Sequence, residues 1–280
     1  MHPYRELSIN ELQKLSFQGD RDAQYFLGLN YEDDGKIAEA CKWFLKSADQ
    51  DHMDSQFKIG FYYRWGDTGF PADANRGEYW LKRAAEKGHD KAQFHLGNYY
   101  RSIGNLGSAA TWFKKAAEQG EKRSMFRYAL LNETRAFPGA NINDAITYYT
   151  KLAQETSVSR IDENNTDAML YLGILYCEGD YMPPDPVKGK EFLEKALRYW
   201  EIARGKIEIQ PYDCYRVGIL YCTGQTNHNK TPGVSDLEKG IKFLNIAIHD
   251  GLEGFHPGNI TLATQIRNDA TEQLRYLNRR

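Results

Sequence analysis

Six side chains that could bind a ligand recur at one position of a repeated helical motif. Each stands two residues before a glycine or alanine, and the other motif positions are small or apolar, so this position is free to vary. Three permanent cations and a histidine occupy it, and such groups bind carboxylates or phosphates by donating charge-assisted hydrogen bonds to them. We call these residues the variable column and predict that they bind a partner: Phe26, Lys58, His95, Arg127, Tyr171 and Arg216. A solvated polar stripe with no partner is the alternative, since helical arrays must expose some polar groups.

The other reactive residue types form no recognisable catalytic or metal-binding pattern. The sequence has no Gly-x-Ser-x-Gly, no His-Glu-x-x-His and no Cys-x-x-Cys, and no phosphate-binding glycine loop follows a predicted strand. Its seven histidines are scattered over different repeats and connecting segments, with a spacing that requires no metal. We therefore predict no enzymatic activity, no catalytic residue, no metal site and no cofactor.

The motif around the variable column reads as a helix with one buried face. In its first copy Ala23, Leu27 and Tyr31 stand four residues apart, so they share a face. The glycine lies in the middle of this helix, where it is expected to allow close helix contact, because a left-handed turn would break the pattern. The glycine-equivalent positions recur after 32, 37, 32, 44 and 45 residues, a period typical of stacked-helix solenoids: Gly28, Gly60, Gly97, Ala129, Gly173 and Gly218.

A second helix follows each first helix. Its pattern is a large aromatic residue with alanines four and five positions later, which gives one apolar face. The clearest copies are 43–48, 80–85 and 112–117. Gly88 and Gly120 follow two of them as expected C-terminal caps. In the first repeat the connector between the two helices is expected at 32–35.

Both ends of the chain resemble caps. Ser8 and Glu11 form a capping-box pattern at the start of a short helix. Near the other end, a helical apolar stripe could close the last repeat: Ile260, Ala263, Ile266, Ala270, Leu274 and Leu277. We therefore predict a single solenoid domain over residues 1–280, with an N-terminal cap at 1–18, six repeats at 19–253 and a C-terminal capping helix at 254–280.

Composition favours neither nucleic acid nor membrane. Charged residues make up 26% of the chain, the net charge is −2, and the basic residues are interleaved with acids. No signal peptide and no apolar stretch of about 18 residues is apparent. Cys177 and Cys222 occupy equivalent positions on neighbouring first helices, whose axes lie about 8–10 Å apart. A disulfide needs Cα atoms within about 7 Å, so we expect reduced cysteines and a cytoplasmic protein.

One repeat carries both halves of a known family pattern. Residues 92–100 give its first helix, small-x-x-x-Leu-Gly-x-x-Tyr, and residues 112–120 its second, aromatic-x-x-x-Ala-Ala-Glu-x-Gly. The chain thus resembles the Sel1-like repeat family, a branch of the tetratricopeptide-type arrays, over about residues 19–250. The resemblance implies an all-α fold, a right-handed α-solenoid of about six helix-turn-helix repeats with N- and C-terminal capping helices. Asn132 departs from the pattern where Tyr is expected, and the paired cysteines of secreted bacterial members are absent.

Members of this family serve as adaptors and scaffolds, which implies a protein or peptide partner in the concave groove. The basic column makes an acidic partner one candidate. The alternative function is a neutralising or regulatory subunit that occludes a specific enzyme or toxin. An enzyme without a recognisable catalytic constellation, and a structural homo-oligomer joined through the end caps, complete the alternatives.

An apolar row lies one helical turn after the variable column. Packing between repeats is its simplest interpretation, and a partly covered row would give the groove an apolar floor. Its members are Leu29, Phe61, Leu130, Ile174 and Ile219, with Asn98 as the polar exception.

Overall fold

The computed structural model describes residues 3–154, 162–179, 183–203, 211–227, 231–250 and 257–279. Within these ranges the chain is all-α, with no strand beyond an isolated bridge between Asp67 and Phe70. The chain divides into two compact units at residues 140 and 141. The first unit contains η1 (Pro3–Glu6), α1 (Ile9–Phe17), α2 (Arg21–Asp33), α3 (Ile37–Asp49), α4 (Met53–Trp65), α5 (Ala74–Glu86), α6 (Asp90–Ser102), α7 (Leu106–Glu118) and α8 (Lys122–Glu133). The second contains α9 (Ile142–Ala153), α10 (Glu163–Glu178), α11 (Pro186–Ala203), α12 (Pro211–Cys222), α13 (Val234–Asp250) and α14 (Pro257–Leu277).

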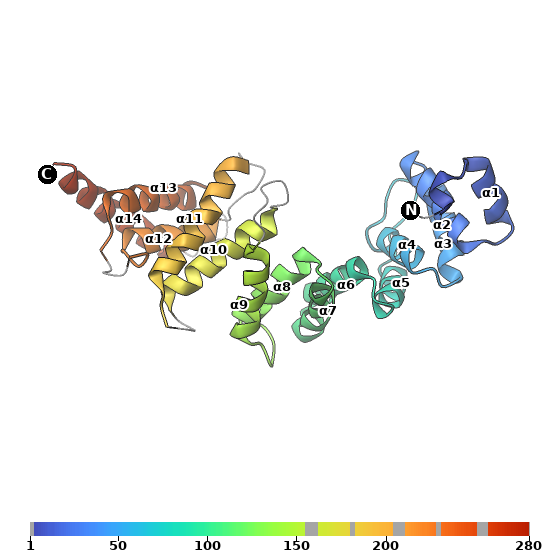
Figure 1. Ribbon diagram of the computed structural model, residues 1–280, viewed down its shortest axis with the longest axis horizontal. Helices are drawn as coiled ribbons and strands as arrows, with labels where there is room; N and C mark the ends of the chain where they lie inside the picture. The colour runs from blue at the N-terminus through green and yellow to red at the C-terminus, as the bar shows by residue number, and fades with distance from the viewer. Residues whose placement is uncertain are drawn as a thin grey trace. The chain divides into compact units, whose positions relative to one another are not determined.

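In the first unit the helices pack as successive pairs (Figure 1). The pairs are α2 with α3, α4 with α5, and α6 with α7, and the second helix of each pair also contacts the first helix of the next. The predicted connector at 32–35 begins two residues too early and ends one residue too soon, because α2 continues through Asp33 and α3 begins at Ile37. Gly35, with a φ of +73°, lies just beyond this extra turn and allows the chain to reverse.

The repeat glycines are contact points between paired helices, as expected. A Cβ atom on Gly28 would lie 2.6 Å from the Phe44 ring, and one on Gly60 would lie 2.8 Å from the backbone nitrogen of Leu81. The same close approach recurs at Gly97 against Phe113, and in the second unit at Gly173 against Leu193 and Gly218 against Leu244. The small residue of the motif therefore sets the distance between the two helices of a repeat.

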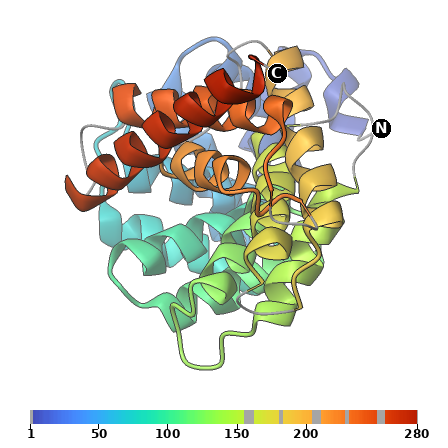
Figure 2. The same ribbon diagram turned by 90° about the vertical axis from the view of Figure 1, so that its left-hand side faces the viewer.

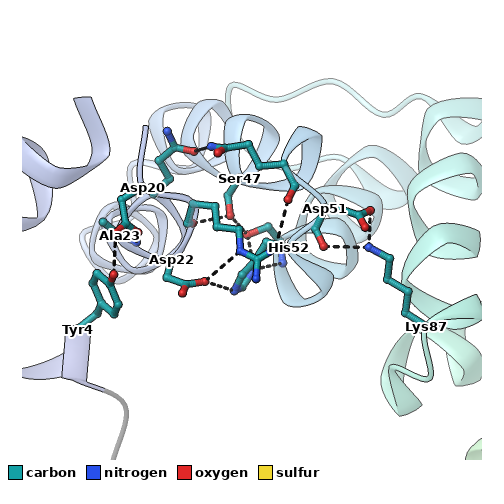
Figure 3. A network of polar contacts seen from close by, with 12 residues as sticks. Tyr4, Asp20, Asp22, Ala23, Ser47, Asp51, His52 and Lys87 are labelled. Atoms are coloured by element: carbon teal, nitrogen blue, oxygen red, sulfur yellow. Dashed lines mark hydrogen bonds and ion pairs between the residues drawn. The ribbon is translucent and has the colours of Figure 1, made fainter. Parts of the chain in front are cut away.

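The predicted N-terminal cap is confirmed. The backbone nitrogen of Ser8 donates to Glu11 Oε2 at 2.9 Å, and the Glu11 nitrogen donates to Ser8 Oγ at 3.4 Å, which completes the capping box of α1. No pattern in the sequence predicted the preceding η1. Its Tyr4 hydroxyl donates to Asp20 at 2.6 Å, and Asp20 itself accepts from the backbone nitrogen of Ala23 at the start of α2 (Figure 3).

The second unit ends in the predicted capping helix. Helix α14 packs against α13 and α12 (Figures 1 and 2), and Ala263 and Ala270 of its apolar stripe are buried. The predicted start of this cap at residue 254 lies outside the described residues. With six helix-turn-helix repeats and a capping helix at each end, the predicted all-α solenoid is confirmed. Among the helices that the structure describes, none combines the length and apolar character needed to cross a membrane.

Candidate partner-binding site

The variable column contacts the preceding repeat. Lys58 on α4 forms an ion pair with Glu32 at the end of α2, with Nζ 2.6 Å from Oε2. Glu32 also accepts a hydrogen bond of 2.5 Å from the hydroxyl of Tyr62, which is buried. Burial, and then this hydrogen bond, raise the pKa of Tyr62. Lys58 is therefore a neutralised charge between two repeats, and its ammonium group is already engaged.

Arg216 repeats this arrangement in the second unit. Its Nη2 lies 2.7 Å from Oε2 of Glu178, and its Nε donates to Oε1 of the same carboxylate at 3.3 Å. Glu178 ends α10, the first helix of the preceding repeat, as Glu32 lies in the last turn of α2. Two of the three cations of the column thus join neighbouring repeats, and neither is a free anion site.

Three further members of the column are wholly or partly covered. Phe26 is buried and stacks on Tyr4 with ring centroids 5.9 Å apart, so the N-terminal cap covers it. Tyr171 is half-buried and stacks on Tyr149 at 5.5 Å. Arg127 is half-buried on α8. The structure therefore does not gather the six predicted residues into one exposed row.

His95 of the column lines a pocket in the first unit. The pocket, of about 460 Å³, opens between α4 and α6, the first helices of the second and third repeats. The His95 ring lies 4.9 Å from the Trp65 ring and 5.4 Å from the Phe61 ring. Burial, with a smaller contribution from the Arg123 guanidinium, lowers the pKa of His95 to about 4. His95 is therefore a neutral aromatic wall at pH 7 and contributes no positive charge.

The pocket combines exposed aromatic surface with two guanidinium groups. Trp65 is 48% exposed and Phe61 36%, although aromatic side chains of this size normally bury most of their area. Arg64 lies over the Trp65 ring at 5.6 Å and over the Tyr99 ring at 5.7 Å. Phe94, Asn98, Arg101 and Ser102 complete the lining. Phe61 and Asn98 belong to the predicted apolar row, and so part of that row lines a pocket, whereas Ile174 in the other unit is buried.

The sequence motifs did not identify Arg64, Trp65 or Arg101. All three follow the recognisable motif, in the last turn of the first helix, where no repeat position marks them. Gly77, near the start of the second helix α5, was also missed. A Cβ atom there would lie 2.8 Å from the Cα of Arg64, so Gly77 lets α5 pack closely behind the pocket wall. A tryptophan two residues after the motif tyrosine, outside the motif, was the signal in the sequence that could have indicated this pocket.

Two histidines outside the column have structural roles. Nδ1 of His52 accepts from the backbone nitrogen of Ser55 at 3.1 Å and caps α4, and His89 caps α6 in the same way. Their Nε2 atoms lie 3.4 Å from Asp22 and Asp54 (the first pair is drawn in Figure 3). An accepting Nδ1 places the proton on Nε2, which then faces the carboxylate. No cluster of three metal-ligating side chains occurs within the described ranges.

Asp213 is a buried acid at a position where the other repeats have alanine or serine. Burial raises its pKa to about 6, against the opposing effects of Arg216 and a hydrogen bond with Tyr171, and its Oδ1 has no hydrogen-bond partner. Serine at the equivalent position in two other repeats, Ser55 and Ser124, is fully buried without carrying a charge. The charge on Asp213 therefore opposes folding of the second unit.

We expect Asp213→Ser to raise the free energy of unfolding by about 1 kcal/mol at pH 7.5. Removal of the buried charge stabilises the fold by more than the loss of one hydrogen bond destabilises it. A folded-state pKa above the unfolded value means that ionisation destabilises the fold above about pH 6. The gain should thus shrink as the pH falls from 6 toward 4. Urea unfolding at pH 7.5 and pH 4.5 measures it, and an equal gain at both values would contradict this explanation.

Comparison with known proteins identifies the repeat. The model of the Sel1 repeat matches residues 21–52, 54–89, 90–121, 122–157, 166–198 and 211–252. A search of curated protein sequences finds no match. Among solved structures, a Sel1 repeat protein from Oxalobacter formigenes is 24% identical, with 85% of this chain and 91% of that chain covered and a TM-score of 0.61.

A second solved structure has the same fold. The protective antigen c5321 of uropathogenic Escherichia coli, which displays an SLR fold, is 18% identical with a TM-score of 0.65. The alignment covers 95% of this chain and 54% of the antigen, so the chain spans about half of its length. At these identities the likeness shows the fold alone. Six matched repeats that together cover most of the sequence show that the chain belongs to the Sel1 repeat family.

Proposed function

We propose that this chain is a non-catalytic scaffold that binds a protein or peptide partner in the groove formed by its first helices. Sel1 repeat proteins generally act as protein-interaction scaffolds. The observation that carries the proposal here is the pocket between α4 and α6, where exposed Trp65 and Phe61 surround an open volume of about 460 Å³. Exposed aromatic side chains beside arginine are typical of the residues that dominate protein interfaces.

Within the variable column the contacts favour His95 as the partner-binding residue. Lys58 and Arg216 have acidic partners within the chain, so an acidic ligand would have to compete with Glu32 and Glu178. The role of the full column remains part of the proposal. A cytoplasmic location is likewise proposed, and the four cysteines, all buried and free thiols, fit a reducing compartment.

Affinity capture from native lysate tests the scaffold proposal. The bait is the full chain, compared with Trp65→Ala at the pocket and with Tyr79→Ala, which removes an aromatic residue 54% exposed on α5 outside the pocket. We expect proteins retained by the unchanged chain and by Tyr79→Ala to be lost from Trp65→Ala. A folded bait that retains no protein above background would contradict the proposed function.

A further inference from the structure

We propose that the α4–α6 pocket recognises a peptide segment of a partner protein in which a bulky apolar side chain lies next to a carboxylate. The inference rests on the proposed scaffold function and names the chemistry of its ligand. It follows from the apolar lining, from the charges at the rim and from what already covers the aromatic faces.

The pocket has room for a large apolar side chain. Its volume of about 460 Å³ falls within the range of about 300–1,000 Å³ typical of ligand pockets. Phe61 and Trp65 of α4 face His95 of α6, and the histidine is neutral because burial lowers its pKa to about 4. Covering the exposed parts of Trp65 and Phe61 would remove apolar area from water, which favours an apolar occupant.

The rim requires a negative charge beside that apolar group. Arg64 and Arg101 both line the pocket, and neither forms an ion pair with any carboxylate in the described part of the chain. The acid near this rim, Glu78, accepts a hydrogen bond from the Tyr99 hydroxyl, which raises the pKa of Tyr99. The two guanidinium groups outnumber this one carboxylate, and they offer bidentate donors to an acidic side chain or a peptide C-terminus.

A cationic occupant is disfavoured by the same geometry. Aromatic faces attract cations, but the Arg64 guanidinium already lies over both Trp65 and Tyr99. A lysine or a quaternary ammonium group would have to displace it and would be repelled by Arg101. The charge of the rim therefore selects an acidic peptide and disfavours a basic one.

Selection from a library of random linear peptides displayed on phage with free C-termini, with the full chain as target, tests this proposal. We expect the selected sequences to be enriched in Trp, Phe or Leu adjacent to Asp or Glu, or adjacent to the C-terminus. Fluorescence polarisation with a synthetic peptide of the consensus then gives its dissociation constant. Trp65→Ala and the double variant Arg64→Gln/Arg101→Gln should each raise this constant about tenfold or more.

Matched controls lie outside the pocket. Tyr79→Ala removes an exposed aromatic residue, and Arg5→Gln/Lys82→Gln removes the same two charges from exposed positions, so both should leave the constant unchanged within about twofold. Amidating the peptide C-terminus separates the two carboxylate sources: weaker binding assigns the terminal carboxylate, and unchanged binding assigns an acidic side chain.

The outcomes separate the two proposals. Selected peptides in which the apolar residue lies next to neither an acidic side chain nor the C-terminus, or that bind the pocket variants as tightly as the controls, would overturn the ligand assignment and leave the scaffold function standing. A properly folded target that selects no peptide would overturn the assignment, and failure to retain any protein in the lysate capture as well would overturn the scaffold function.

Discussion

Gly60→Ala is expected to lower the free energy of unfolding by about 1–2 kcal/mol. The added methyl carbon would lie 2.8 Å from the backbone nitrogen of Leu81, so α4 and α5 must separate. Overpacking of this kind typically costs about 1–3 kcal/mol, and the better helix propensity of alanine, worth about 1 kcal/mol, offsets only part of it. Urea unfolding followed by circular dichroism measures the change.

Gly107→Ala is the matched control. Gly107 also lies in a helix, α7, but no atom lies within 4 Å of the Cβ position. The substitution should therefore stabilise the protein, by about 0.5 kcal/mol at this position near the helix start. If both alanines change stability alike, helix propensity decides the outcome, and the repeat glycine is not a contact point.

Glu32→Ala is expected to destabilise the first unit by about 2 kcal/mol. It leaves the buried Tyr62 hydroxyl and the partly buried Lys58 ammonium group without their shared acceptor. An unsatisfied buried polar group costs about 1–3 kcal/mol, and the two partners here lose one carboxylate together. The measurement is again urea unfolding, at low and at moderate salt.

Glu39→Ala controls for loss of a helical glutamate in an ion pair. Glu39 pairs with Lys42 on the surface of α3, where the two side chains are 49% and 65% exposed. Such surface pairs contribute about 0–1 kcal/mol and weaken with salt. Equal losses for Glu32→Ala and Glu39→Ala would show that the contact between the first two repeats adds nothing beyond a surface pair.

Repetition explains why much of the fold follows from the sequence. Each copy of the motif predicts the same pair of helices. The fourth copy, with Ala129 at the glycine position, matches the motif less well, but its neighbours with Gly97 and Gly173 match it clearly. The glycine contacts could be inferred because alanine replaces glycine in one copy, which excludes a left-handed turn. The caps followed from local signals such as Ser8 and Glu11, which act within one helical turn.

The candidate site was harder to predict from the sequence because it depends on contacts between repeats. The variable column was expected to project freely, yet Lys58 and Arg216 reach acids of the preceding repeat. Glu32 was assigned to a connector, so its pairing with Lys58 could not be anticipated from the motif. The pocket residue Trp65 lies beyond the last position of the repeated motif, and the packing of α4 against α6 brings it beside His95.

Site-specific photo-crosslinking tests most directly whether a partner binds at the face between α4 and α6. A photoreactive phenylalanine analogue replaces Ser102 at the pocket rim, and in a second sample it replaces Lys82, exposed on α5. After irradiation in native lysate, we expect protein adducts at position 102 that disappear when Trp65→Ala is added, with none above background at position 82. Adducts at position 82 alone, or adducts at 102 that persist with Trp65→Ala, would contradict binding at this face.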